Sequence, residues 1–564
     1  MIAKRHIIFF IVFALMALVL VLAACQATPT ATPTTAPPTP TAPALAAPTP
    51  TTAAAAPAVA ATATRPPSAP TPIPATPTAK VTSKGKIVLA ISSEPSNMDT
   101  LLQTIGPDTR HIYPSVMEYL MQRDWKTFNL SGLLAEKWEQ VKPDTWRYTL
   151  KKGIKFHNGE PFNADAVVFS LGKIADKDSG AQLQRYWPAG GKVVKVDDFT
   201  VELTSSTADP IQPLRLLYLP SVPPKWAREN PEERPVKLIG TGPYKFVEWV
   251  RGQYVKVTAN DDYWATPPNI KDATFVWRPE ASVRAAMLRT GEADFAVDLT
   301  PEDAQKVPKY TATTSVETTA IRYDQQSNPV VKDKRVRLAM NLAFDKNLLV
   351  EKLFSGFVEP AKGQIFGEYV LGFNPNLKAY PFDVEQAKKL LAEAKAAGIP
   401  WETTELDMWI SKGRLPRIEE MGESLADSWN KLGMKVKVYV AEQAKWRDAA
   451  QYALGPGQKR VALTVWPHGN DLGDSGQTAD YVRCGGRLSA FCDAALDAKI
   501  NQAAEATGEQ RVKLYQEFWK LMYEEYVPHI PLFRLKPIYG LSKRLAFTPR
   551  MDDLAPVQEM KLLE

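Results

Sequence analysis

The chain has 564 residues, of which 68 are lysine or arginine and 62 are aspartate or glutamate, giving a formal net charge of +6 at pH 7. Charges of both signs are interspersed, and no basic block or arginine–aromatic stripe is present, which argues against a nucleic-acid-binding protein. No stretch beyond the first apolar run is long enough to span a bilayer, so we expect a soluble body. Without leader and linker, roughly 480 residues remain, which is room for two or three domains.

An apolar run opens the chain and ends in a cysteine. Lys4 and Arg5 precede the run, which covers residues 7–21, and Leu22 and two small alanines separate it from Cys25. This order of charged, apolar and small residues is typical of an export signal. A cysteine directly after the cleavage point resembles the lipobox of bacterial lipoproteins. The run, at roughly 15 residues, is short for a membrane span of about 20. We therefore predict a signal peptide at residues 1–24 and lipidation of Cys25, with an uncleaved membrane anchor as the alternative.

Residues 25–83 are almost entirely alanine, threonine and proline, with Arg65 as the only charge before Lys80. Such a segment buries too little apolar surface to offset the entropy of ordering it, so we predict a disordered linker. Its prolines favour extended polyproline II, which is typical of an extracellular stalk. We expect the body to be held by lipid outside the cytoplasm, on the periplasmic side or the outer face of the cytoplasmic membrane.

The other two cysteines, Cys484 and Cys492, lie close together in the sequence. In an oxidising compartment this spacing predicts a disulfide, and its short loop would contribute roughly 2–3 kcal/mol on the chain-entropy account. A metal site is the less favoured alternative, because no histidine neighbours the pair and the spacing is not the short C-x-x-C kind. We expect the bond to hold the turn at Gly485 and Gly486.

The body alternates between strand-like and helical patterns, which predicts a mixed α/β fold. In the first half we predict two single strands and two hairpins, at residues 86–91, 145–156, 192–203 and 244–259. The hairpins are expected to turn at an Asp–Asp pair, residues 197–198, and at an Arg–Gly pair, residues 251–252.

The second half is richer in helical spacing. Apolar residues recur at helical intervals over residues 334–353, and Asp383 and Gly398 are predicted to cap and to stop a further helix. The clearest unit is strand, helix and strand, which predicts a right-handed parallel crossover, at residues 406–410, 418–432 and 435–440. A long helix and a final strand follow at residues 509–526 and 530–535.

Motifs of catalysis are absent from the sequence. One of the five histidines lies in the leader and none belongs to an H-E-x-x-H motif; those in the body are His111, His157, His468 and His529. The chain also has no G-x-S-x-G elbow and no Walker A loop, and residues 240–243 lack the third glycine of a dinucleotide loop. The acidic pair Asp552 and Asp553 is interpreted as part of a polar turn. We therefore predict no enzyme, no cofactor and no bound metal, so any energy from ATP would come from another subunit.

Several segments resemble one protein family in both order and spacing. The longest match covers residues 134–170, with the sequence Phe-His-Asn-Gly at residues 156–159 near its centre. Shorter matches lie at residues 240–244, 260–264, 288–294 and 336–345. On these residues the chain resembles the family 5 extracellular solute-binding proteins, which are the receptors of peptide and nickel ABC importers. The resemblance covers nearly everything from residue 86 to residue 535.

The resemblance implies an α/β fold with two lobes and a hinge, the periplasmic-binding-protein-like fold of type II, in its large class with an extra domain inserted in lobe I. The signal peptide and the disordered linker would precede it. Lobe I would comprise residues 84–125, 240–320 and 530–564. The inserted domain would cover residues 126–239, and lobe II residues 321–529. His157 falls in the inserted domain and is interpreted as a packing or turn residue.

The resemblance also indicates where a ligand would bind in lobe I. The segment that follows the first strand borders the cleft in this family, and here it contains Glu94 and Asn97. Open α/β sheets bind ligands beyond the carboxyl ends of their strands, which is where this segment is predicted to lie.

In lobe II, Trp409 ends one predicted strand, and a second strand over residues 461–466 leads into a segment rich in Asp and Gly. Peptide-binding members of the family hold the ligand's amino group with an acidic residue here and its side chains with aromatic walls. Asp471 or Asp474 would take the first role, and Trp409 and Trp466 the second. His468 lies beside them. An Asp/Gly turn made rigid by the disulfide is the alternative interpretation.

The function implied is a monomeric, lipid-anchored receptor that captures oligopeptides between its lobes and delivers them to the permease and ATPase subunits of an ABC importer. One alternative keeps the fold and changes the ligand to a nickel chelate, an oligosaccharide or another small solute such as an opine. For a metal, His468 and His111 are the only histidines considered. A second alternative is an exported hydrolase or a sensor lipoprotein without transport.

Overall fold

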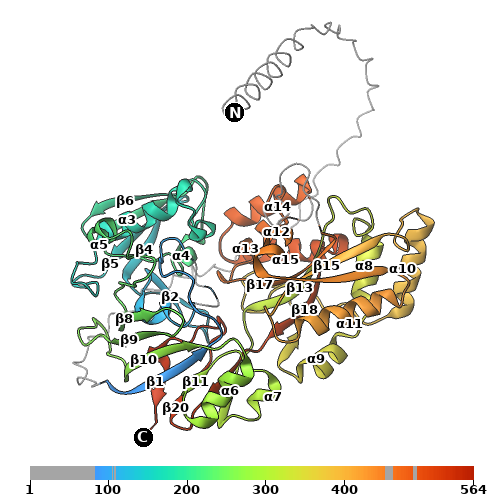
Figure 1. Cartoon of the computed structure of the whole chain (residues 1–564). Coiled ribbons are helices and arrows are strands. Elements are labelled where there is room, and N and C mark those ends of the chain that lie inside the picture. Colours follow the sequence, from blue (N-terminus) through green and yellow to red (C-terminus); the bar gives the residue numbers. More distant parts are fainter. Residues whose placement is uncertain are drawn as a thin grey trace, which may run out of the picture. The chain divides into compact units, whose positions relative to one another are not determined.

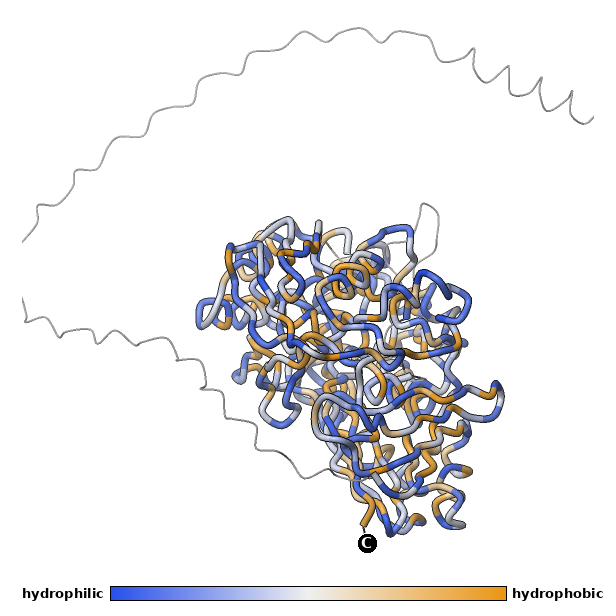
Figure 2. Tube along the Cα trace, turned by 90° about the vertical axis from the view of Figure 1, so that its left-hand side faces the viewer, coloured by the Kyte–Doolittle hydropathy of each residue, from blue (hydrophilic) through white to orange (hydrophobic). Residues whose placement is uncertain are grey.

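The computed structural model describes residues 83–103, 106, 109–450, 461–486, 489 and 492–563. The predicted signal peptide, the lipidated Cys25 and the linker before Ser83 lie outside the described residues. Within the described part of the chain, no helix combines the length and the apolar character that crossing a membrane requires. Apolar and polar positions alternate closely along its trace (Figure 2).

Lobe I, as we use the term, is built on a seven-stranded sheet with the order β12-β19-β11-β1-β10-β9-β8. Its strands in chain order are β1 (Lys84–Ile91), β8 (Tyr244–Val250), β9 (Tyr254–Ala259), β10 (Ile270–Trp277), β11 (Phe295–Ala296), β12 (Lys309–Ala312) and β19 (Ile538–Leu541). The first strand runs parallel to both β10 and β11, so the carboxyl ends of all three meet at one edge. The predicted strand at residues 86–91 and the hairpin at residues 244–259 are confirmed.

Each face of this sheet is covered by apolar side chains. Helices α6 (Ala281–Thr290) and α7 (Pro301–Ala304) lie together near one face (Figure 1). The other face shares a large hydrophobic cluster with the segment between β1 and β8 and with the C-terminal residues. The short elements around this cluster are α2 (Tyr113–Val116), β2 (Met121–Arg123), β3 (Leu130–Gly132), α4 (Gln212–Arg215), α5 (Pro224–Glu229), β20 (Leu545–Ala546) and β21 (Lys561–Leu562).

A four-stranded antiparallel sheet, β4-β5-β7-β6, lies between β1 and β8 in the chain. It comprises β4 (Ala135–Lys142), β5 (Thr145–Leu150), β6 (Lys192–Asp197) and β7 (Thr200–Thr204) and packs against α3 (Ala164–Ala175). The predicted hairpin at residues 192–203 is confirmed, whereas the strand predicted at residues 145–156 ends at Leu150. His157 lies just beyond it, and its imidazole contacts the backbone of Gly240 and Gly242.

Lobe II is built on a six-stranded sheet with the order β14-β18-β13-β17-β15-β16. Its strands in chain order are β13 (Glu317–Tyr323), β14 (Val358–Pro360), β15 (Glu405–Ser411), β16 (Lys435–Ala441), β17 (Leu463–Gly469) and β18 (His529–Leu535). Strands β15 and β16 are parallel and are joined through α11 (Ile418–Asn430), which confirms the predicted crossover. Both β13 and β18 belong to this sheet as whole strands, so the boundaries expected at residues 320/321 and 529/530 are misplaced. The chain crosses between the sheets near residues 313–316 and 536–537.

Helices cover both faces of the lobe II sheet (Figure 1). One cluster lies under α8 (Lys334–Leu342), α9 (Lys346–Phe354), α10 (Val384–Ala396) and α11. The opposite cluster lies under α12 (Gln443–Ala450), α13 (Ser475–Ala479), α14 (Ala494–Glu505) and α15 (Gly508–Leu521).

Residues 334–353 form two helices, because the Asp345 carboxylate accepts hydrogen bonds from the Asn347 and Leu348 amides and so caps a new helix start. Asp383 caps α10 as predicted, and Gly398 follows its end with φ of 82°. The predicted helix at residues 509–526 changes to π-helical geometry over Met522–Tyr526.

Candidate functional site

The carboxyl ends of the parallel strands are the first place to look for a ligand site, because open α/β sheets bind ligands there. In lobe I these ends lead into Ser92 and Asp298. In lobe II, β15 runs parallel to β17 as well as to β16. Strand β17 extends through His468 to Gly469, so the predicted exit at Trp466 is three residues early. The loop after β17 contacts lobe I.

We call Asp471, Leu472 and Gly473 the bridging loop. Arg123 of β2 donates hydrogen bonds to the carbonyl oxygens of Asp471 and Leu472, at 3.1 and 2.6 Å. The Tyr218 hydroxyl donates to the same Asp471 carbonyl at 3.0 Å. The Leu472 side chain is buried in the hydrophobic cluster of lobe I. Polar and apolar contacts thus join this lobe II loop to lobe I.

The Asp471 carboxylate takes part in the same junction. Its Oδ2 accepts a hydrogen bond from the Tyr186 hydroxyl at 2.9 Å and lies 4.0 Å from the Arg185 guanidinium. Burial raises the pKa of Asp471, and Arg185 and Tyr186 counteract that rise. A ligand amine held by Asp471 would therefore share this carboxylate with Tyr186 and Arg185 of lobe I.

Asp474 is fully engaged inside lobe II. Both of its carboxylate oxygens pair with Arg511, at 2.6 and 2.9 Å, and both side chains are nearly inaccessible, at 1% and 4% exposure. The carboxylate also accepts from the Gly476 amide and caps α13. A role for Asp474 in holding a ligand amine stays a proposal, and it would require this buried pair with Arg511 to open.

The two tryptophans predicted as walls differ in exposure. Trp409 is half-buried, donates its indole N–H to Asp407 at 3.1 Å and stacks on Tyr439. Trp466 is only 7% exposed and packs against His468, Tyr481 and the Arg322 guanidinium. The structure therefore leaves Trp409 with accessible surface, whereas Trp466 is a core side chain in this conformation.

His468 is buried in the same core. Its Nε2 lies 2.7 Å from the Thr478 hydroxyl, and burial lowers its pKa to about 3, with a further contribution from Arg322. The side chain is therefore neutral at physiological pH. Among the described residues, no three or more His, Cys, Asp or Glu side chains gather as a metal site would require.

Glu94 and Asn97 serve contacts within lobe I. The Glu94 carboxylate accepts from the Trp249 indole and from the Gly252 amide at the tip of the β8–β9 hairpin, both at 3.0 Å. Asn97 accepts from the Asp99 amide at 2.7 Å. Neither contact reaches the bridging loop, so a ligand role for these two residues stays a proposal.

A second group of charged and polar residues was not predicted from the sequence. We call it the Arg110 cluster, and it comprises Arg110, Asp298, Ser315, Glu317 and Asp553. The Arg110 guanidinium donates to Asp298 at 2.9 Å and lies 4.0 Å from Asp553. Ser315 donates to Asp553 at 2.8 Å. Glu317 pairs with Arg414 at 2.6 Å. Four distant segments supply the cluster, so no local motif could have shown it, and Asp553 is more than a turn residue.

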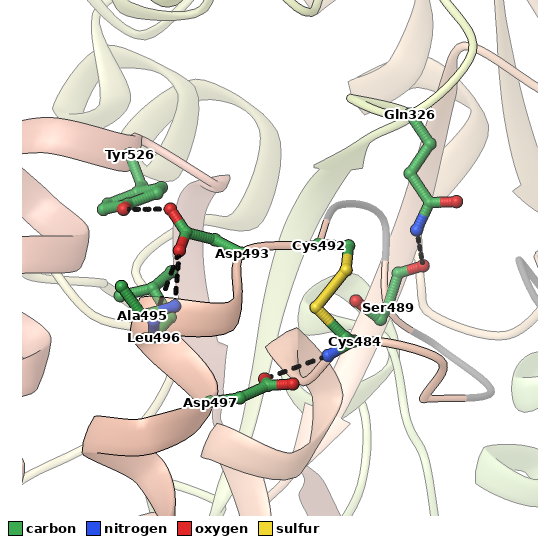
Figure 3. Close-up of a disulfide and its surroundings, with 9 residues drawn as sticks. All are labelled: Gln326, Cys484, Ser489, Cys492, Asp493, Ala495, Leu496, Asp497 and Tyr526. Atoms are coloured by element: carbon green, nitrogen blue, oxygen red, sulfur yellow. Dashed lines mark hydrogen bonds between the residues drawn. A yellow bond between two sulfur atoms is a disulfide. The ribbon is translucent and has the colours of Figure 1, made fainter. Parts of the chain in front are cut away.

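Cys484 and Cys492 form a disulfide that joins the end of the 3-10 turn Asp480–Val482 to the start of α14 (Figure 3). The Cys484 amide donates to Asp497 on α14 at 3.1 Å. Asp493 caps the same helix and accepts from the Tyr526 hydroxyl at 2.6 Å. The bond therefore fastens α14 next to the segment that carries Tyr481, a neighbour of Trp466.

Comparisons with known proteins support this architecture. The chain is 26% identical over 510 residues to heme-binding protein A of Haemophilus influenzae. This match covers 83% of this chain and 90% of that protein. It is 27% identical over 441 residues to the dipeptide-binding protein of Escherichia coli, and the match covers 70% of this chain and 78% of that protein. The oligopeptide-binding protein AppA of Bacillus subtilis, solved with a nonapeptide, superposes with a TM-score of 0.72 at 22% identity, covering 85% of this chain and 99% of that one.

Residues 129–475, more than half of the chain, match the family described as bacterial extracellular solute-binding proteins, family 5 Middle. The solved structures show the two-lobed fold, as the resemblance implied. Members of this family are solute-binding proteins and not enzymes. The chain belongs to family 5 of the bacterial extracellular solute-binding proteins.

Proposed function

We propose that this protein captures oligopeptides between its two lobes and delivers them to the permease of an ABC importer. The observation that carries the proposal is the bridging loop, because it joins the lobes beside the carboxyl ends of β15 and β17. The family match and the peptide-binding relatives support a peptide ligand.

Selection would come from binding energy rather than from chemistry. Closure of two lobes around a ligand excludes water and strengthens the hydrogen bonds inside. Trp409 would supply apolar surface for ligand side chains, and Asp471 a carboxylate at the junction. The Tyr186–Tyr218 stack, with ring centroids 4.6 Å apart, would face that carboxylate from lobe I.

Native mass spectrometry of the full-length chain, purified in mild detergent and then denatured, tests the proposal. We expect the released material to be a ladder of short peptide masses. A single sugar, metal-chelate or haem mass would overturn the peptide ligand and leave the fold and the family unchanged. Haem is included because one relative is named a heme-binding protein.

We also propose a signal peptide at residues 1–24, a lipid on Cys25 and a linker that tethers a monomeric body outside the cytoplasm. The order of residues around Cys25 supports this proposal. Labelling cells with a radioactive fatty acid should mark the wild-type protein and not a Cys25→Ser variant, and the variant should leave the membrane fraction. Equal labelling of both would contradict the lipid anchor.

A further inference from the structure

The loop between β15 and α11, residues 412–417, carries two arginines that bind different parts of the molecule. The Arg414 guanidinium pairs at 2.6 Å with Glu317, the first residue of β13 in the same lobe. The Arg417 guanidinium pairs at 2.5 Å with Glu302, which lies on α7 of lobe I. One short loop of lobe II therefore forms one ion pair within its own lobe and one with the other lobe.

The Arg417–Glu302 pair is a contact between the lobes that is separate from the bridging loop. The loop 412–417 follows β15 and the bridging loop follows β17, and these two strands are parallel neighbours in the lobe II sheet. The bridging loop contacts the segment between β1 and β8, whereas Arg417 contacts α7, which follows β11. Two separate contacts thus join the lobes at the strand ends where a ligand is proposed to bind.

The start of α11 does not explain why an arginine occupies position 417. Arg417 is the N-cap residue of this helix, where Ser, Thr, Asp or Asn is preferred, and an arginine side chain has no acceptor atom with which to cap it. Its backbone also has φ of 54° and ψ of 26°, a left-handed conformation that is unfavourable for a residue with a Cβ. The ion pair with Glu302 gives the arginine a role that the helix start does not.

The pair is placed to respond to salt. The Arg417 and Glu302 side chains are 37% and 48% exposed. An exposed ion pair of this kind changes an equilibrium by up to about fivefold. Salt screens exposed charges, so this contribution falls as the ionic strength rises. A contact of this strength biases the balance between two arrangements of the lobes without locking it.

We infer that Arg417 and Glu302 form a latch that favours the closed arrangement of the lobes and weakens as ionic strength rises. The pair exists only while α7 and the start of α11 lie side by side, so separation of the lobes breaks it. The Arg414–Glu317 pair lies within lobe II and persists in both arrangements. The inference rests on the proposed function, in which the lobes close on a ligand, and adds the residues that set the closed-to-open ratio.

Single-molecule fluorescence energy transfer in the full-length chain measures that ratio. The dyes are attached through azide-bearing residues substituted for Ser282 on α6 and Lys389 on α10, which are exposed and lie in different lobes. Without peptide, added salt should lower the closed-to-open ratio of the wild type. Glu302→Gln should lower it by about two- to fivefold and remove most of its salt dependence. Glu233→Gln is the matched control, because its similarly exposed pair with Lys237 lies within lobe I.

Exchanging the two charges separates a latch from a merely structural role. Glu302→Arg or Arg417→Glu alone should lower the closed-to-open ratio further, and the two together should restore it. A ratio that is equal in the wild type and Glu302→Gln overturns the inference, and so does a double exchange that recovers nothing.

A mixture of unblocked tripeptides, added as the probe, separates the inference from the proposed function. If the tripeptides close no variant while salt and Glu302→Gln still shift the ratio, the latch stands and the peptide ligand is overturned. One unchanging distance between the dyes under every condition overturns both, because the lobes would then not open and close.

Discussion

The bridging loop and the Arg110 cluster both lie between the lobes, but their hydrogen bonding differs. In the bridging loop, the Asp471 and Leu472 carbonyls and the Asp471 carboxylate accept hydrogen bonds from three residues of lobe I. In the Arg110 cluster, a buried carboxylate oxygen lacks any partner among the described residues. The bridging loop therefore joins the lobes through paired polar groups, whereas the cluster keeps one buried acceptor unpaired among the described residues.

The largest expected effect comes from breaking the support of the bridging loop. Asp474→Ala would leave the Arg511 guanidinium buried without its carboxylate, so we expect the free energy of unfolding to fall by about 3–5 kcal/mol. Urea unfolding followed by circular dichroism measures it. Asp427→Ala is the control, because its pair with Lys431 is exposed and should cost less than about 1 kcal/mol. Equal losses of unfolding free energy in Asp474→Ala and Asp427→Ala would contradict a stabilising role for the buried Asp474–Arg511 pair.

Acid should weaken lobe II next to the bridging loop. Burial lowers the folded-state pKa of His468 and of His529 to about 3, while both titrate near 6.5 when unfolded. The contribution of these two histidines to stability is therefore fully present above pH 6.5. It is lost as the pH falls toward 3, because only the unfolded chain takes up the protons. At pH 5 we expect a loss of about 2 kcal/mol for each histidine. Urea midpoints that do not change between pH 7 and pH 5 would contradict this.

The Arg110 cluster should favour the folded state more at low pH than at high pH, which is opposite to the effect of the two histidines. Asp553→Asn removes a buried charge whose folded-state pKa is raised to about 7, so at pH 8 we expect stabilisation by about 2 kcal/mol. Because the folded pKa lies above the unfolded value, the cost of ionisation is greatest above pH 7 and vanishes as the pH falls toward 4. Thermal unfolding at pH 8 and at pH 4.5 measures the difference. Destabilisation at pH 8 would show that the carboxylate is structural.

The smallest change is expected at the edge of the bridging loop. Tyr186→Phe deletes the hydroxyl that donates to Asp471, and we expect a loss of about 1 kcal/mol in the free energy of unfolding. Tyr310→Phe, at an exposed side chain, should change nothing measurable. If Tyr186→Phe lowered the free energy of unfolding as much as Asp474→Ala, this single hydroxyl would supply most of the stability of the contact between the lobes.

Local sequence patterns predicted the local elements well. The crossover from β15 to β16, two hairpins and the Asp383 cap follow from periodicity and capping residues that are close in the chain. The same patterns could not show that β13 and β18 join lobe II, because strand pairing between distant segments leaves no local trace.

Candidate site residues were harder to predict than the elements. Asp471 does lie at the junction of the lobes, but the Asp/Gly composition could not tell it from Asp474, whose partner Arg511 is 37 residues away. The Arg110 cluster was missed because its residues come from distant segments that only the folded chain brings together.

Hydrogen–deuterium exchange of the full-length chain, with and without a saturating mixture of unblocked tripeptides, tests most directly whether a peptide is held between the lobes. We predict that peptide slows exchange on both sides of the junction at once, in the backbone of the bridging loop in lobe II and around Ser92 and Asp298, beyond the carboxyl ends of β1 and β11 in lobe I. Protection confined to one lobe, or none, would contradict the account.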